Sequence, residues 1–193
     1  MKKPIPLIIG VLMLDQALKF WIKSNMMLGE EIHVLDWFII HFTENKGMAF
    51  GMEFGGEWGK YLLSFFRIIA IFGIAWYLRE LVKENAKKGV VISIALVLAG
   101  AIGNMIDSAF YGLIFSHSYG QVSTLMTGGY AEFLQGHVVD MFYFPLINSH
   151  FPDWMPFIGG DHFIFFRPVF NIADTAISLG VINLLLFNRA FFK

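Results

Sequence analysis

The chain has 193 residues, of which 56% are hydrophobic and 15% charged, and its formal net charge is −1. A soluble domain usually carries about 25% charged residues, so this composition predicts a single integral membrane domain spanning residues 1–193. The chain has no basic tract that would bind phosphates, and we therefore expect no nucleic-acid partner. It has no cysteine, which excludes disulfides, thiolate metal ligands and cysteine nucleophiles. The histidines lack the helical spacing of a metal site, so neither a metal nor a cofactor is expected.

Four apolar segments are predicted as membrane helices. They lie at about residues 5–23, 61–81, 89–110 and 168–187. Between the first two, residues 36–43 are rich in β-branched and aromatic side chains, which is typical of strands. The expected fold is therefore an all-α polytopic membrane protein with four transmembrane helices and a small extracytoplasmic β element between helices 1 and 2.

The distribution of basic residues predicts the orientation. The densest basic cluster runs from Arg79 to Lys88, between the second and third expected helices, and basic residues also lie close to both ends of the chain. Short basic loops stay in the cytoplasm, so we expect both termini inside and residues 24–60 and 111–167 outside. Within the second outer segment, the apolar run from Val138 to Ile147 is too short to span a membrane.

Four aspartates in apolar surroundings are expected at a similar depth, close to the outer face: Asp15, Asp107, Asp140 and Asp174. An ionisable group inside a membrane is costly, which makes each a functional candidate. Two close carboxylates in a low dielectric share one proton, so one can activate water while the other protonates a carbonyl oxygen. This chemistry favours peptide hydrolysis. The alternative is a proton-coupled transporter, although transporters usually place the site at the midplane and show internal repeats.

Two polar pairs on the expected helices allow both a structural and a functional interpretation. Asp15 and Lys19 are spaced i, i+4, and this spacing alone favours a neutralised pair that only docks the first helix. Asn104 and Asp107 share a face of the third helix with two glycines. The glycines are explained by close helix packing, whereas the amide and the carboxylate both need partners away from water.

Five short motifs occur in a fixed order from the first expected span to the fourth. They are Asp15-Gln16-x-x-Lys19, Asn45-x-Gly47-x-Ala49-Phe50-Gly51, Gly100-x-x-Gly103-Asn104-x-x-Asp107, Gly136-x-Val138-Val139-Asp140 and Phe170-Asn171-x-Ala173-Asp174. With this set the chain resembles the lipoprotein signal peptidase family of bacteria, signal peptidase II. One motif alone would be weak, whereas the ordered set is specific.

The resemblance implies an aspartyl endopeptidase of the inner membrane that cuts diacylglyceryl-modified prolipoproteins before the lipidated cysteine. The family's catalytic pair falls on Asp140 and Asp174. Its supporting or substrate-binding positions fall on Asp15, Lys19, Asn45, Gly47, Asn104 and Asn171, which moves the Asp15–Lys19 pair towards function. The expected partners are lipid-modified prolipoproteins and membrane lipids, and we expect a monomer. Inhibition by the cyclic peptide globomycin is also implied.

Two features depart from the family pattern. Many members have arginine directly after the aspartate of the third motif, where this chain has Ser108. The segments 111–135 and 141–167 are also long. The Gly, Ser and Thr content of residues 113–135 predicts a mobile segment that is dispensable for chemistry.

Overall fold

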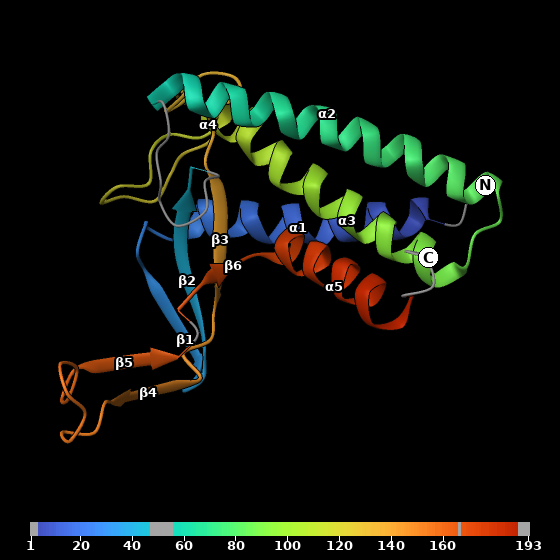
Figure 1. Cartoon of the computed structure of the whole chain (residues 1–193). Coiled ribbons are helices and arrows are strands. Elements are labelled where there is room, and N and C mark those ends of the chain that lie inside the picture. The colour runs from blue at the N-terminus through green and yellow to red at the C-terminus, as the bar shows by residue number, and fades with distance from the viewer. Residues whose placement is uncertain (1–3, 47–55, 166, 189–193) are drawn as a thin grey trace.

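The computed structural model describes residues 4–46, 56–165 and 167–188, and its helices run side by side away from a small sheet (Figure 1). The helices are α1 (Ile5–Asn25), α2 (Gly56–Lys83), α3 (Lys88–Ile106), the π-helical turn η2 (Asp107–Tyr111), α4 (Gly112–Ile114) and α5 (Ile172–Phe187). The turn between α2 and α3 lies at the end of the helices opposite the sheet, beside the first turn of α1 and the last turn of α5 (Figure 1).

Among the described residues, three helices are long and apolar enough to cross a membrane: Ile5–Asn25, Trp58–Lys83 and Lys88–Ile114. They confirm the first three expected spans, with the second and third longer than predicted. α5 is apolar but has 16 residues, fewer than the roughly 20 that a straight spanning helix needs. The fourth span therefore stays a prediction, and its helix begins at Ile172 rather than at residue 168.

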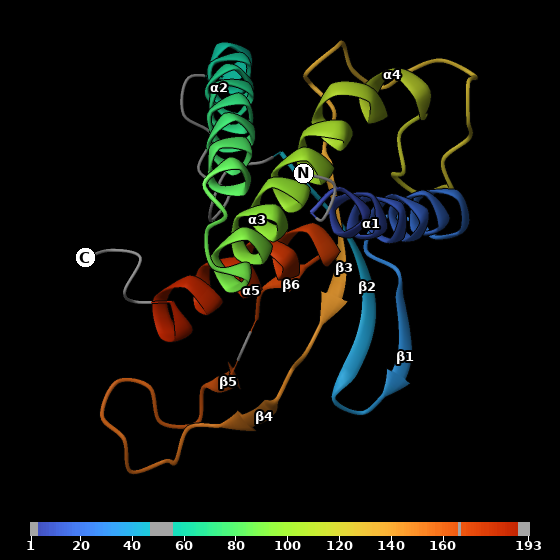
Figure 2. The same cartoon turned by 90° about the vertical axis from the view of Figure 1, so that its right-hand side faces the viewer.

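Antiparallel strands form the sheet, in the order β1-β2-β3-β6. The strands are β1 (Glu31–Leu35), β2 (Phe38–Asn45), β3 (Val138–Tyr143) and β6 (Val169–Phe170). A separate hairpin pairs β4 (Ile147–His150) with β5 (His162–Phe165) and projects away from the helices (Figures 1 and 2). The β element between helices 1 and 2 is confirmed as the β1–β2 hairpin.

The all-α description is too narrow, because β3 and β6 extend that hairpin from the far side of the sequence. The run starting at Val138 is too short to satisfy its backbone as a membrane helix, and it pairs with β2 instead. Residues 169–170 pair with the other edge of β3, which delays the start of α5. These pairings place the carboxyl-terminal helix directly beside the sheet.

Close packing of α5 and α1 against α3 depends on two glycines. A Cβ on Gly100 would lie 2.2 Å from the carbonyl oxygen of Ala173 in α5. A Cβ on Gly103 would lie 2.8 Å from Oδ2 of Asp15 in α1. Only residues without a side chain allow such an approach, so these positions bring polar groups of α1 and α5 onto the same face of α3.

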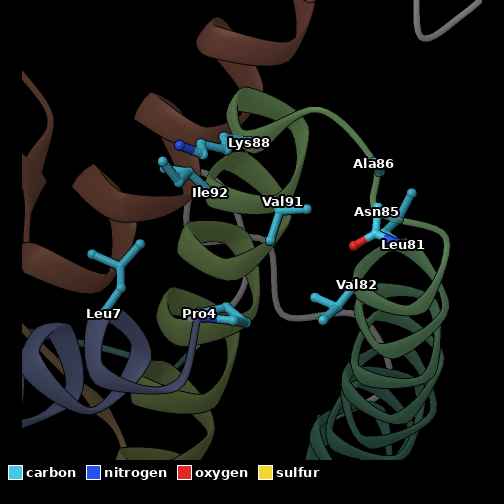
Figure 3. Close-up of a pocket in the computed structure, with 9 residues that line it drawn as sticks. All are labelled: Pro4, Leu7, Leu81, Val82, Asn85, Ala86, Lys88, Val91 and Ile92. Atoms are coloured by element: carbon cyan, nitrogen blue, oxygen red, sulfur yellow. The ribbon is translucent and has the colours of Figure 1, made fainter. Parts of the chain in front are cut away.

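An apolar core fills the junction between the sheet, α1 and the end of α3. Its buried members are Ile22, Met26, Phe42, Tyr111, Phe115, Val139 and Met141. At the opposite end of the helices, a pocket of about 630 Å³ lies between α1, α2 and α3 (Figure 3). Its lining is apolar except for Asn85 and Lys88. It includes residues of the α2–α3 turn, which lies at the end of the helices opposite the sheet (Figure 1).

The segment from residue 113 to 135 is anchored at several points, which does not support its prediction as a mobile segment. Ser118 and Ser123 are buried. The Lys60 ammonium donates to the carbonyl of Gln135 at 2.6 Å, and the Ser64 hydroxyl donates to the carbonyl of Leu134 at 3.3 Å. The segment thus connects the start of α2 to the rest of the protein.

Candidate active site

The two aspartates predicted as the catalytic pair come from a strand and a helix. Asp140 lies in the middle of β3, opposite Thr43 of β2, and is 5% exposed. Asp174 lies in the first turn of α5, where Asn171 is the N-cap. The Asn171 side chain accepts from the Asp174 N–H at 2.9 Å, and the Asp174 carboxylate accepts from the Asn171 N–H at 3.4 Å. This capping box fixes the position of Asp174.

Two asparagine amides connect the carboxylates. The Asn171 Nδ2 donates to Oδ1 of Asp140 at 2.7 Å, and the Asn104 Nδ2 donates to Oδ1 of Asp174 at 2.7 Å. The two amides also meet, since Asn171 Nδ2 lies 3.1 Å from Oδ1 of Asn104. Each carboxylate is therefore held by an amide that also contacts the other amide, so the two carboxylates are linked by a continuous chain of hydrogen bonds.

The surroundings of Asp140 favour its protonated form. Burial and the nearby Asp174 carboxylate raise the pKa of Asp140 to about 7. The charge of Lys19 and the hydrogen bonds from Asn171 and Asn45 act in the opposite direction. Near neutral pH the pair can thus hold one proton, which is the state needed for one carboxylate to accept a proton while the other donates one.

Lys19 is the centre of the polar network beneath the pair and is completely buried. Its ammonium lies 2.9 Å from Oδ2 of Asp15 and 2.8 Å from Oδ2 of Asp107. It also donates to Oδ1 of Asn104 at 2.9 Å. A lysine ammonium has three N–H donors, and these three acceptors satisfy all of them. Lys19 therefore joins α1 to the side of α3 that contacts Asp174.

The two supporting aspartates bind the backbone next to the candidate pair. The Asp15 Oδ1 accepts from the N–H of Ala173 at 2.9 Å, one residue before Asp174. The Asp107 Oδ2 accepts from the N–H of Val139 at 3.2 Å, one residue before Asp140. Both are almost fully buried. Asp15 and Asp107 thus set the positions of the helix start and the strand that carry the pair.

Gln16 belongs to the first motif and is a further residue of the site that the sequence did not predict. Its Nε2 donates to Oδ1 of Asp107 at 2.9 Å and to the carbonyl of Gly103 at 3.2 Å. Its Oε1 accepts from the Tyr111 hydroxyl at 3.3 Å. The sequence feature that could have identified it is a polar amide inside an apolar helix, directly after Asp15. Gln16 thus binds one oxygen of the Asp107 carboxylate while Lys19 binds the other.

Arg67 of α2 was also not predicted as a site residue, and its charge acts on Asp174. Ser108, at the position where many family members have arginine, is buried and donates to the carbonyl of Asn104 at 3.1 Å. A cation of α2 therefore adds to the electrostatic field at Asp174, whereas the position after Asp107 contributes only a hydroxyl bonded to its own helix.

The structure brings together the predicted residues Asp140, Asp174, Asp15, Lys19, Asn104 and Asn171, and Asn45 hydrogen-bonds Asp140 from the neighbouring strand. Gly47 lies outside the described residues. Asn45 is exposed and Asp174 is partly exposed, so one side of the pair is open. Within residues 4–46, 56–165 and 167–188, no group of three or more His, Asp and Glu side chains is arranged to hold a metal ion.

Comparisons with known proteins show which family the chain is similar to. A family model described as signal peptidase (SPase) II matches residues 7–191. A lipoprotein signal peptidase of Porphyromonas gingivalis is 50% identical over 182 residues, which is 93% of this chain and 79% of that protein. A lipoprotein signal peptidase of Amoebophilus asiaticus is 40% identical over 181 residues, 92% of this chain and 73% of that protein.

Solved structures share the fold. A bacterial membrane enzyme solved at 2.3 Å by the in meso method has a TM-score of 0.66 and 22% identity, covering 98% of this chain and 89% of that chain. A second, solved at 1.9 Å by the same method, has a TM-score of 0.62 and 23% identity, covering 96% and 92%. At these identities the likeness concerns the arrangement of helices and strands.

Proposed function

Because the chain belongs to the signal peptidase II family of bacterial membrane proteins, we propose that it is an intramembrane aspartyl endopeptidase. Its substrates are diacylglyceryl-modified prolipoproteins, and it releases the signal peptide by cutting before the lipidated cysteine. The observation that carries the proposal is the connected carboxylate pair. Asn171 donates to Asp140 at 2.7 Å while it caps the helix turn that carries Asp174, and Asn104 donates to Asp174 at 2.7 Å.

The reaction follows from one proton shared by Asp140 and Asp174. The ionised carboxylate takes a proton from a water molecule, which attacks the scissile carbonyl carbon. The protonated carboxylate donates to the carbonyl oxygen, and a tetrahedral diol forms without a covalent enzyme intermediate. Its collapse breaks the C–N bond, and a proton passes to the leaving nitrogen. The two titrations belong to the pair, so neither aspartate is assigned as the only acid or base.

The proposed location is the cell inner membrane, with both termini cytoplasmic and the pair near the outer face. The basic α2–α3 turn lies at the end of the helices opposite the sheet, and the positive-inside rule places that turn in the cytoplasm (Figure 1). The carboxylates then lie where a lipid-anchored cysteine presents its neighbouring peptide bond. Exposed apolar side chains on α1 and α2, such as Met13 and Phe72, suit contact with membrane lipid around a monomer.

The test incubates the purified protein with a diacylglyceryl-modified prolipoprotein and follows the appearance of the shorter product by mass spectrometry. We expect cleavage before the modified cysteine and slow or no cleavage of the unlipidated precursor. Equal rates on both substrates would contradict the specificity. No cleavage by folded protein, together with solute uptake driven by a pH gradient, would favour the transporter alternative.

A further inference from the structure

A second buried polar cluster lies beside the sheet, separate from the carboxylate pair. Lys23 of α1 and Glu44 of β2 form an ion pair, with the Lys23 side chain 0% and the Glu44 side chain 5% exposed. The Lys23 ammonium also donates to Oγ of Ser118 at 2.8 Å, and Ser118 donates to Oε1 of Glu44 at 3.1 Å. The Nδ1 of His137 lies 3.0 Å from Oε2 of Glu44.

The cluster joins segments that are distant in sequence. The Lys23 ammonium lies 4.7 Å from the ring centroid of Tyr130, and the Tyr130 hydroxyl accepts from the N–H of His137 at 2.7 Å. The Ser123 hydroxyl donates to the carbonyl of Lys23 at 2.5 Å. The Lys23–Glu44 ion pair and its neighbours thus connect four parts of the chain. These are the end of α1, strand β2, the segment from residue 113 to 135, and the residue before β3.

The register of the sheet connects Glu44 to the candidate pair. Glu44 lies opposite Val139, between Thr43, which lies opposite Asp140, and Asn45. Successive side chains of a strand point to opposite faces, so Glu44 faces the cluster while Asn45 faces Asp140. Asn45 hydrogen-bonds the Asp140 carboxylate. A displacement of Glu44 would therefore move Asn45, which donates a hydrogen bond to Asp140. It would also move the part of β2 that pairs with β3 at Asp140.

Glu44 carries its charge within this cluster. Although burial opposes ionisation, the hydrogen bond from His137 and the charge of Lys23 lower the pKa of Glu44 to about 2. Glu44 is therefore ionised at any pH at which the enzyme would be assayed. Removing one partner of a buried ion pair leaves the other charge uncompensated, whereas removing both avoids that cost.

We propose that Glu44 is a positioning residue for the Asp140–Asp174 pair, held by its buried ion pair with Lys23 and acting through Asn45 and the β2–β3 pairing. This role rests on the proposed peptidase function. It also makes residues 113–135 part of the scaffold of the site, because Ser118 and Tyr130 complete the cluster.

The experiment compares Glu44→Gln, Lys23→Met and the double variant with the parental full chain, using lipidated prolipoprotein as substrate. Glu44→Gln keeps the shape and one acceptor oxygen, but it removes the charge and replaces the other acceptor oxygen with an NH2 donor. We expect kcat per folded molecule to fall about 10-fold or more, because small displacements of catalytic groups are costly. KM should stay within about twofold, since the Glu44 side chain is buried against Lys23 and is not available to bind substrate. The double variant should be no slower than either single variant, because both act through one pair.

The pH profile of kcat separates positioning from simple destabilisation. The groups that set the ionisation of Asp140 are Asp174 of α5, Lys19 of α1, Asn171 and Asn45. The hydrogen bond from Asn45 favours the ionised form, so its weakening in Glu44→Gln should move the alkaline limb of the profile to higher pH. The matched control is Glu80→Gln, which breaks the partly exposed Glu80–Lys83 ion pair in the last turn of α2. This variant should leave kcat and its pH profile unchanged.

A folded Glu44→Gln variant with parental kcat and an unshifted profile overturns the proposal. So do multiplicative effects of the two single substitutions, which would mean that Lys23 and Glu44 act independently. If Glu44→Gln does not fold, Glu44→Asp serves instead: it keeps the charge but shortens the side chain, and parental kcat in that variant also overturns the proposal. An inactive parental protein would contradict the peptidase function itself, which is a distinguishable failure.

Discussion

The carboxylate of Asp107 accepts a hydrogen bond from the N–H of Val139 at 3.2 Å, directly before Asp140 in the chain. Asp15 has the same relationship to Ala173, directly before Asp174. Lys19 lies between the two supporting carboxylates and contacts both. One buried lysine therefore couples the positions of both candidate catalytic residues, although these come from a strand and a helix.

Replacing either member of the pair with asparagine should abolish turnover without preventing folding. Asp140→Asn and Asp174→Asn keep the side-chain shape but remove the shared proton, so each should lower kcat by at least about 1,000-fold. The double variant should be hardly worse, because groups that act as a unit are not additive. Cleavage of lipidated substrate is measured on folded, membrane-inserted protein, with the exposed Asp36→Asn as control. Near-parental cleavage by either single variant would remove the pair from the mechanism.

The supporting aspartates should have smaller effects. Asp107→Asn retains an oxygen that can accept from Val139, but it removes one of the two carboxylates around the buried Lys19. We expect measurable cleavage with kcat reduced by about 10- to 100-fold, through displacement of Asp140. Asp15→Asn should behave similarly through Ala173 and α5. Thermal unfolding in detergent, run in parallel, should show both variants destabilised, and complete inactivity of a stable Asp107→Asn would argue for direct participation instead.

Activity should fall on the alkaline side of neutral pH. The pKa of Asp140 is raised to about 7 by burial and the Asp174 carboxylate, so the shared proton is retained below that pH and lost above it. The same titration affects stability. Because the pKa of Asp140 is higher in the folded protein than its ordinary value of about 4, the bound proton stabilises the folded state fully below about pH 4. This contribution to the free energy of unfolding is lost as the pH rises from about 4 through about 7. Asn45→Ala removes a hydrogen bond to the ionised form and should shift the alkaline limb of kcat upward. An unchanged limb would show that the titration belongs to another group.

The topology is tested with alkaline phosphatase fusions, which are active only outside the cytoplasm. Fusions after Glu44 in β2 and after Asp153 in the β4–β5 hairpin loop should be active. A fusion after Lys87, in the α2–α3 turn, should be inactive because the basic residues keep that turn inside. Activity at Lys87 would reverse the orientation and place the carboxylate pair on the cytoplasmic side.

The segment from residue 113 to 135 should contribute to stability. Ser118→Ala removes a hydroxyl that contacts both Lys23 and Glu44, and we expect a loss of about 1–3 kcal/mol because buried charged groups lose a partner. Thermal unfolding measures it, with Tyr119→Ala at the exposed neighbouring position as control. If Ser118→Ala unfolds at the parental temperature, the segment is not held through this cluster.

Much of the site could be predicted from sequence because its residues lie in short motifs with local spacing. Asp15 and Lys19 are one helical turn apart and do pair. Asn171 and Asp174 form a capping box whose spacing is visible in the chain. The length and hydropathy of the first three helices needed no tertiary information either, because a membrane requires continuous apolar helices.

Only the tertiary structure decided how these motifs meet. β3 pairs with β2 across almost a hundred residues of chain, which no local pattern encodes. The run starting at Val138, predicted only to be too short to span a membrane, is therefore a central strand of the sheet. The same pairing sets Glu44 opposite Val139, and the junction with α1 buries Glu44 against Lys23. The sequence by itself determined which groups would be costly to bury in a membrane. The fold decided which partners compensate each of them, because hydrogen bonds and ion pairs between distant segments form only after strands and helices have packed.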